Sequence, residues 1–591
     1  MLRRTGPILR SCMRQVHTHA TASPARKNGY AIAAGLAVGG TAIRYTVVNP
    51  TFNDATLIVA PPLAQLEARK PLYPKTEDPN TLHTLAWGSN SDRTLSPSSS
   101  PTEALRHPAI AKWLEGVALR DMQLHERYGA CVDARGDVYQ WGDGFYGPTL
   151  SGEHPPKRTL KNKNIVQLQL TEDKVYALSA SGRVYCFSSG VLNQGLRPGA
   201  PTPASDSWWG TGWLWGEDED IDFVEVAPTN ALAWREKFTS LAAGDSHVLA
   251  LTSKGRVFAH PVNKRANLYG QLGFRKFSIP DHAAKITHRD SHMNVELIPK
   301  SLADPYLKQS QAVRVNSDAF ASDNLSKVDD KPIRFCPYLF EIPVLKGVEV
   351  AQIAAGGRTS FVRTPTGRVL GWGANEHGQV GLGSSVSLDT ITVPTEVILW
   401  RFVRNNVQSR CLNVVAGGDL TGFVVERLSE QGPNTTDLLM CGNGQYGGLG
   451  NNTFSNNQGN PSRVKAVSGL LQYNDAKAGL EAIQPDEISI SHSGHILLSL
   501  TSNPDVNGVG GRDLLVWGRN NESELGNGKR SNAVVPTPVQ SPDEHERFML
   551  REKKAREVND LAGKVWKRGV KVKQQVVSGF NNSVVYWKIV N

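Results

Sequence analysis

The feature that most constrains this chain is a block of sequence that recurs along most of its length. In the clearest copy, residues 353–381, two short apolar runs each end in glycine, and Thr366-Gly367 stands between them. Glycine adopts a positive φ without a Cβ clash, so this dipeptide predicts a tight turn between two strands. Trp372-Gly373 closes the second run, and a glycine-rich loop follows. Self-similarity of this kind predicts a repeat architecture and outweighs any single short motif.

The copies of this block add up to seven. A lone second run ends in Trp87-Gly88 near the start of the chain, and a lone first run, residues 576–587, lies at its end. Paired with each other, these halves make one unit and close a ring, which removes exposed sheet edges. The sequence therefore predicts an all-β, seven-bladed propeller closed by pairing an N-terminal strand with C-terminal strands. The six complete units are residues 116–147, 165–195, 238–273, 348–383, 412–450 and 487–526.

Three insertions interrupt the propeller, residues 81–591, at about 205–233, 275–346 and 543–569. The last is charged, and its apolar residues recur at helical spacing, which predicts an amphipathic helix. The first carries a tryptophan cluster beside an acidic run. Propellers usually bind through loops between blades, and tryptophan is enriched at binding hot spots, so this cluster is a candidate partner-binding site. Packing of the rings on the propeller flank is the competing interpretation. The cluster comprises Trp208, Trp209, Trp213 and Trp215.

Most of the positive charge lies at the amino terminus. Residues 1–53 hold seven basic residues and no acid, so of the net +10 the rest of the chain carries 10 − 7 = +3, which is weak evidence for a nucleic-acid partner. The arginine-rich, acid-free residues 1–24 predict a mitochondrial transit peptide, with a disordered basic tail as the alternative. Residues 25–80 hold a linker and a weakly apolar run, residues 30–48, that approaches the length of a bilayer span. We expect a single transmembrane segment there; a flexible or packed Ala/Gly segment is the alternative.

No motif in the chain predicts catalysis. The six cysteines are scattered without a C-x-x-C pair, which argues against disulfides or zinc, and Cys441 replaces the repeat's tryptophan as a small core residue. Residues 442–447 match G-x-G-x-x-G, but no helix can follow them, so nucleotide binding is not expected. Ser246 and His247 are neighbours on a strand and point to opposite faces, so they do not form a nucleophile–base pair. We predict a protein that is not an enzyme, with no catalytic residue, cofactor or metal site.

The repeated motifs resemble a known family. The turns Gly244-Asp-Ser-His247 and Ala355-Gly-Gly-Arg-Thr-Ser360, with the Trp-Gly-x-Asn-x-x-Gly-Gln loops, are similar to those of the regulator of chromosome condensation family of seven-bladed propellers. The resemblance covers roughly residues 80–591. Tyr128 and Lys174 depart from it, because they stand where the family usually has His, Ser or Thr.

Together with the leader and residues 30–48, the chain resembles the fungal mitochondrial members of that family, which are inner-membrane proteins associated with assembly of respiratory complex III. The resemblance implies a non-enzymatic interaction scaffold at the mitochondrial inner membrane, its propeller facing the matrix. Its partners would be cytochrome bc1 subunits or assembly intermediates, and neither a nucleic acid nor a small-molecule substrate is expected. The alternatives are guanine-nucleotide exchange on a mitochondrial GTPase, an activity of some family members, and maturation of mitochondrial ribosomes or RNA, which would need a contiguous basic patch.

Overall fold

The computed structural model describes most of the chain beyond residue 80. The described residues are 81–97, 104–147, 154–197, 200, 220–280, 292–302, 313–315, 329–401, 403, 406–430, 432–474, 478–501, 512–539 and 548–590. The leader, the run at residues 30–48 and the tryptophan cluster lie outside them. None of the helices in this described part combines the length and the apolar character of a membrane span.

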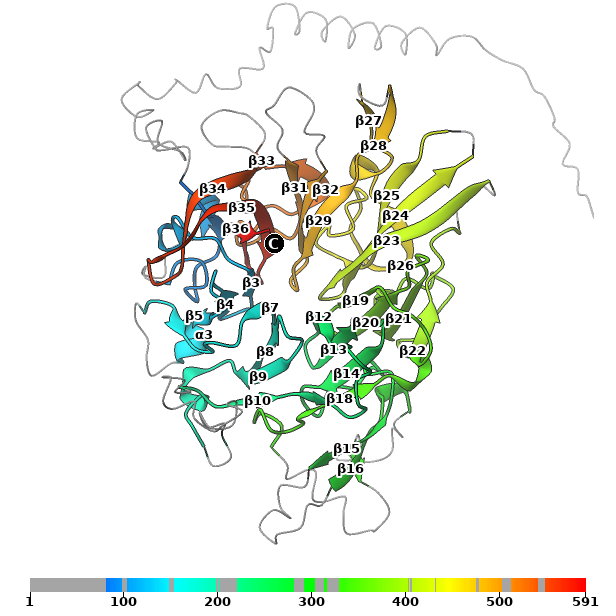
Figure 1. Ribbon diagram of the computed structural model, residues 1–591. Helices are drawn as coiled ribbons and strands as arrows, with labels where there is room; N and C mark the ends of the chain where they lie inside the picture. The colour runs from blue at the N-terminus through cyan, green and yellow to red at the C-terminus, as the bar shows by residue number, and fades with distance from the viewer. Residues whose placement is uncertain are drawn as a thin grey trace, which may run out of the picture. The chain divides into compact units, whose positions relative to one another are not determined.

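Seven of the sheets follow one another around a ring (Figure 1). Each has an inner strand that contacts the inner strands of the two neighbouring sheets, and the last of these strands contacts the first, so the ring is closed. The predicted seven-bladed propeller is confirmed. The inner strands are β3 (Asp121–Leu124), β7 (Ile165–Leu170), β12 (Phe238–Ala243), β19 (Gln352–Ala355), β23 (Val407–Gly417), β29 (Pro485–Ile490) and β35 (Val565–Ser578).

Blade 1 joins the two ends of the propeller. Its strands run in the order β2-β1-β36-β35-β34, and β1 pairs antiparallel with β36 in the register Leu85↔Val585. The predicted pairing of the two incomplete units is therefore confirmed. Its further strands are β1 (Leu85–Gly88), β2 (Leu105–Ile110), β34 (Glu552–Asn559) and β36 (Asn582–Ile589).

Blades 2 to 7 follow in chain order, each beginning with its inner strand. Blade 2 continues with β4 (Gly129–Val132), β5 (Val138–Trp141) and β6 (Lys157–Arg158), and blade 3 with β8 (Lys174–Ser179), β9 (Val184–Ser188) and β10 (Phe223–Glu225). Blade 4 has β13 (His247–Thr252), β14 (Val257–Pro261) and β18 (Tyr338–Glu341), and blade 5 has β20 (Thr359–Arg363), β21 (Val369–Ala374) and β22 (Thr390–Glu396). Blade 6 has β24 (Leu420–Ser429), β25 (Thr435–Gly444) and β26 (Ser455–Arg463), and blade 7 has β30 (His495–Leu500), β31 (Arg512–Gly518) and β32 (Ala533–Pro538).

The repeated tryptophan ties a blade to the one before it. Trp372 of blade 5 is fully buried, and its indole N–H donates to the carbonyl of Gln271 in blade 4 at 2.9 Å. A buried indole N–H needs such a partner, which explains why the residue recurs with its loop. In blade 6, Cys441 takes this place; it is buried, with its Sγ 3.5 Å from the carbonyl of Gln379 in blade 5. The predicted core position of Cys441 is confirmed. Equivalent bonds join Trp87 to Glu524, Trp141 to Thr94 and Trp517 to Gly448.

The blades define two faces of the ring. We call the end at which the inner strand turns into the second strand the turn face; residues 356–359 form one such turn. We call the end at which the inner strands begin the start face, and there the second strand turns into the third. At the start face, Gly367 has a φ of +86°, and a Cβ on it would come within 2.5 Å of Arg410, so the predicted turn is confirmed. Strand β1 runs away from the start face, antiparallel to β36, which runs toward it, so the described propeller begins and ends on the side of the start face.

Two insertions contain strands of the blades. Residues 205–233 include β10, the outer strand of blade 3. Residues 275–346 include β18 of blade 4 and a separate sheet of β15 (Lys276–Pro280), β16 (His292–Leu297) and β17 (Val313–Val315). A hairpin of β27 (Leu471–Asn474) and β28 (Gly479–Ala482) joins blades 6 and 7 at the start face.

The amphipathic helix predicted within residues 543–569 is wrong. The described part forms β33 (Met549–Leu550), β34 and the start of β35. The two long strands turn where the Asp560 carboxylate accepts the N–H of Lys564 at 2.8 Å. Ala555 and Val558 are buried, but Val565, expected on the same helical stripe, is 46% exposed. Their spacing coincided with a helical period, but pairing with the valine-rich β35 decides the structure.

Candidate functional site

The mouth of the central channel opens on the turn face. It is a cavity of about 610 Å³ lined by the turns of all seven blades, and we call it the axial mouth. Adjacent turns are joined through the backbone where glycine allows close approach: the N–H of Gly357 donates to the carbonyl of Gly418 at 2.9 Å. A Cβ on Gly418 would lie 2.3 Å from the carbonyl oxygen of His492 in the next blade. Glycine at this position is what lets these turns pack together.

Arg358 binds blades 4, 5 and 6 together at the axial mouth. Its guanidinium donates to both carboxylate oxygens of Asp419, at 2.9 and 3.1 Å, and to Glu376 at 2.7 Å. It also donates to the hydroxyl of Tyr269 at 2.8 Å and lies over that ring. Forked, charge-assisted bonds of this kind are strong and fix geometry. Both terminal nitrogens of the Arg358 guanidinium are therefore engaged in bonds that hold the three blades together.

Titratable groups also face the axial mouth. His492 Nδ1 lies 3.3 Å from the carboxylate of Asp245, and its ring stacks on Phe580. Burial in the channel raises the pKa of Asp245, and the neighbouring imidazole of His492 offsets part of this rise. Burial, with some repulsion from His492, lowers the pKa of His125 to about 4, so His125 is neutral at physiological pH.

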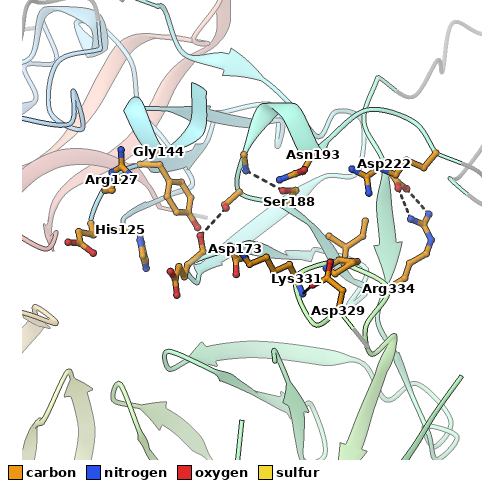
Figure 2. Close-up of a pocket in the computed structure, with 18 residues that line it drawn as sticks. His125, Arg127, Gly144, Asp173, Ser188, Asn193, Asp222, Asp329, Lys331 and Arg334 are labelled. Atoms are coloured by element: carbon orange, nitrogen blue, oxygen red, sulfur yellow. Dashed lines mark hydrogen bonds and ion pairs between the residues drawn. The ribbon is translucent and has the colours of Figure 1, made fainter. Parts of the chain in front are cut away.

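A second cavity lies beside the axial mouth, among blades 2 and 3 and the end of the second insertion. We call it the lateral pocket (Figure 2); its volume is about 700 Å³. The axial mouth and the lateral pocket share His125, Glu126 and Glu172, so they form one continuous surface, which we call the turn-face site. Charged side chains of both signs dominate the pocket lining: Glu126, Arg127, Glu172, Asp173, Arg197, Asp222, Asp329, Lys331 and Arg334.

The returning end of the second insertion is anchored at this pocket. Arg334 donates to both carboxylate oxygens of Asp222, at 2.5 and 2.6 Å, as Figure 2 shows. Lys174 is buried, and its ammonium donates to the carbonyls of Val262 at 2.6 Å and of Asp330 at 3.0 Å. Burial lowers the pKa of Lys174. The side chain that departs from the repeat in blade 3 thus attaches the insertion to the propeller.

Tyr128 and Lys174 occupy equivalent positions in their blades. The backbone N–H of the residue three positions earlier donates to the carbonyl of Tyr128, and likewise to the carbonyl of Lys174. In the same way, Gly244 donates to His247, and Gly356 donates to Thr359. Tyr128 donates its hydroxyl to the carbonyl of Thr171 at 2.6 Å and so joins blade 2 to blade 3. Tyr128 lines the lateral pocket, and Lys174 directly follows Asp173, which lines it too.

The motifs that superficially resemble functional sites are parts of the repeat framework. His247 is fully buried, with its Nε2 2.8 Å from the hydroxyl of Ser360, and burial lowers its pKa to about 4. Residues 442–447 comprise the end of β25 and the start of its connection to β26, and no helix follows them, which rules out a βαβ nucleotide site there. Among the described residues, no group of His, Cys, Asp and Glu side chains is arranged to hold a metal ion. The five described cysteines are buried and unbridged.

The lateral pocket is not apparent from the sequence. Its walls come from residues 125–128, 172–173 and 329–334, and only the fold brings them together. The signal that could have located it is the loss of the repeat pattern in blades 2 and 3, because a repeat position freed from its structural role can serve a ligand. Arg197 and Asp222, on either side of the tryptophan segment, also line the pocket.

Models of the Regulator of chromosome condensation (RCC1) repeat match residues 366–424 and 513–550, and a second model of this repeat matches residues 350–379. The matches fall on blades 5 to 7. The propeller therefore carries repeats of the RCC1 type in these blades.

Two curated relatives are mitochondrial proteins by name. Protein FMP25 of Saccharomyces cerevisiae is 22% identical over 412 residues, which cover 62% of this chain and 64% of that protein. The RCC1 domain-containing protein RUG3 of Arabidopsis thaliana is 26% identical over 281 residues, covering 46% of this chain and 56% of that protein. The chain thus matches less than two thirds of the length of each. Among solved structures, Prp20p of Saccharomyces cerevisiae aligns with a TM-score of 0.48 at 17% identity, over 87% of this chain and 93% of that one.

Proposed function

We propose that this propeller is a non-enzymatic mitochondrial interaction scaffold that holds a protein partner on its turn-face site. The observation that carries the proposal is the composition of the turns in blades 2 and 3. Where blades 5 and 6 have glycines, these turns have Glu126 and Glu172, whose side chains face a cavity rather than a neighbouring turn. The predicted transit peptide and the two mitochondrial relatives support the location.

The chemistry of the turn-face site suits a protein surface. Its lining carries both charge signs at close spacing, which favours a partner with complementary charges and sets specificity more than affinity. The site holds no nucleophile–base pair among its described side chains. In the sequence, the tryptophan segment lies between Arg197 and Asp222, both of which line the pocket. We propose Trp208, Trp209, Trp213 and Trp215 as apolar anchors that complement this polar surface.

The more specific role rests on the family resemblance. We propose that residues 30–48 hold the protein at the inner membrane, that the propeller faces the matrix, and that the partner is a cytochrome bc1 subunit or assembly intermediate. A GTPase whose nucleotide exchange is promoted, or a ribosomal or RNA-containing particle, is the alternative partner.

Site-specific photo-crosslinking in isolated mitochondria tests this proposal. A photoreactive residue at Arg127 or Glu172 should give crosslinks to bc1 subunits or their assembly factors. The same residue at Lys254, an exposed turn of the start face, is the matched control and should not. Replacing Trp208 and Trp213 with serine should weaken the crosslinks from Arg127. Crosslinks to a GTPase or to ribosomal proteins alone would contradict the bc1 assignment, and equal crosslinking from Lys254 would contradict the site itself.

A further inference from the structure

The start face carries exposed apolar side chains in several blade connections. Trp234, just before β12, is 82% exposed. Trp400, in the connection from β22 to β23, is also exposed. Tyr473 and Leu480 lie directly opposite each other on the β27–β28 hairpin, and both side chains are exposed. Leu388 and Phe454 are exposed on the turn face as well, so the apolar side chains indicate an interaction surface only together with the charge that the start face also carries.

The same face carries a basic hairpin, formed by β34 and the first half of β35. Lys554 and Lys571 stand directly opposite each other across these strands, a like-charge pair that disfavours the fold. Within the described part of the chain, Lys554, Arg556 and Lys567 make no ion pair with an acidic side chain. The hairpin therefore holds positive charge that the propeller does not neutralise.

The hairpin adjoins the point at which the amino-terminal part of the chain reaches the propeller. The ammonium of Lys553 donates to the carbonyl of Thr81, the first described residue, at 3.0 Å. Only 80 − 48 = 32 residues separate Thr81 from the end of the run at residues 30–48. A segment of this length reaches at most about 110 Å.

We propose that the start face docks on an anionic phospholipid bilayer. Basic side chains near a bilayer are attracted by anionic headgroups, and tryptophan and tyrosine concentrate at the membrane–water interface. The proposal rests on the membrane location proposed above, since a span at residues 30–48 keeps the hairpin within reach of the lipid. The turn face is the opposite end of the blades, so docking leaves the turn-face site open to a partner.

Two other interpretations explain less of this face. Lysines on edge strands protect against aggregation, and both strands are edges in this hairpin, because β36 pairs only with residues 572–578 of β35; but that role gives no reason for exposing Trp234 and Trp400 on the same face. A single-stranded RNA would use the basic and aromatic side chains, but it gives no reason for exposing Leu480 and Val565. A lipid surface accounts for the basic, aromatic and aliphatic side chains together.

Vesicle flotation with the full chain tests the proposal. One set of vesicles is pure phosphatidylcholine, and the other contains one part cardiolipin to four parts phosphatidylcholine. The full chain should float more with the anionic vesicles, and added salt should reduce the difference. The double variant Lys554→Gln, Lys567→Gln should lower binding to anionic vesicles on the order of tenfold and leave binding to neutral vesicles unchanged.

The matched control removes the same charge from the turn face. Lys529 and Arg530 are exposed in a loop there, and the double variant Lys529→Gln, Arg530→Gln should retain the anionic preference. Equal losses in both variants, or no loss in the hairpin variant, would overturn the proposal. Loss of single-stranded RNA binding in the hairpin variant, with no preference for anionic vesicles in the full chain, would overturn it in favour of a nucleic-acid surface. Crosslinking at the turn face fails or succeeds independently of these results, so the two proposals are distinguishable.

Discussion

The turns of blades 5 and 6 differ from those of blades 2 and 3 in what their side chains bind. Arg358 and Arg127 occupy the same position of the turn. The Arg358 side chain is 25% exposed and forks onto Asp419, whereas that of Arg127 is 59% exposed and reaches only Asp92, at 3.3 Å. The same position in the repeat thus holds the ring together in one sector and faces a pocket in another. A repeat fold can lose its pattern in two adjacent blades because the other five and the closed ring keep the scaffold.

Removal of the buried tryptophan of blade 5 should have the largest effect on stability. Trp372→Ala leaves a cavity between blades 4 and 5 and should lower the free energy of unfolding by about 3–5 kcal/mol. Trp372→Phe is the matched control, because blade 3 has the buried Phe187 at this position. This variant should lower the free energy of unfolding by only about 1 kcal/mol, because it loses the hydrogen bond to Gln271. Denaturant unfolding measures both. Equal losses would mean that the indole bond, not the packing, links the blades.

The two equivalent arginines should differ in how much they contribute to stability. Arg358→Ala removes bonds to Asp419, Glu376 and Tyr269 and should destabilise the propeller by about 2–3 kcal/mol. Arg127→Ala removes one exposed ion pair and should change stability by less than about 0.5 kcal/mol. Thermal unfolding of the two variants gives the result. A comparable loss from Arg127→Ala would show that the blade 2 turn is structural after all.

The regular parts of this propeller were predictable because their causes are local. The Thr366-Gly367 turn, the composite blade with Trp87 and the core position of Cys441 each follow from residues read in register. The lateral pocket was not predictable, since Arg127, Asp173 and Lys331 meet only after the insertion has returned to the ring. The helix predicted within residues 543–569 is wrong because apolar spacing alone does not reveal that β34 pairs with β35.

The first residue of the second strand is a different titratable group in blade 3, Lys174, and in blade 4, His247. Burial lowers the pKa of His247 to about 4, below the 6.5 of an unfolded histidine. Between pH 6.5 and pH 4, His247 is protonated in the unfolded chain and neutral in the folded one. The free energy of unfolding therefore decreases as pH falls from 6.5 to 4. His247→Gln should remove this part of the acid destabilisation, on the order of 2 kcal/mol at pH 4. The free energy of unfolding, measured as a function of pH, tests this prediction. If the variant loses as much stability below pH 6.5 as the wild type, His247 is not buried as a neutral imidazole.

Lys174, at the same position in blade 3, should act at the alkaline end. Burial lowers its pKa below the usual 10.5, so the unfolded chain binds the proton more readily, and stability rises as pH increases toward 10.5. Lys174→Met should remove this increase in the free energy of unfolding and leave its pH dependence below pH 6.5 unchanged. A variant that altered the pH dependence in both ranges would show that the substitution had disturbed the returning insertion rather than one titrating group.

The smallest effect on stability is expected at Glu172, where the effect on binding should be clear. Glu172 lines both the axial mouth and the lateral pocket, and the equivalent residue of blade 6 is Gly418. Glu172→Gln keeps the shape and removes the charge, so the unfolding transition should stay within about 0.5 kcal/mol of the wild type. Crosslinking from Arg127 to the partner should fall, because a carboxylate that meets a basic group on the partner is lost. The paired substitution Glu396→Gln on blade 5 removes a carboxylate that already binds Arg368 at 2.7 Å, and it should leave crosslinking unchanged. If both variants crosslink like the wild type, blades 2 and 3 have lost the repeat pattern without gaining a partner, and the contrast between the two sectors is one of packing alone.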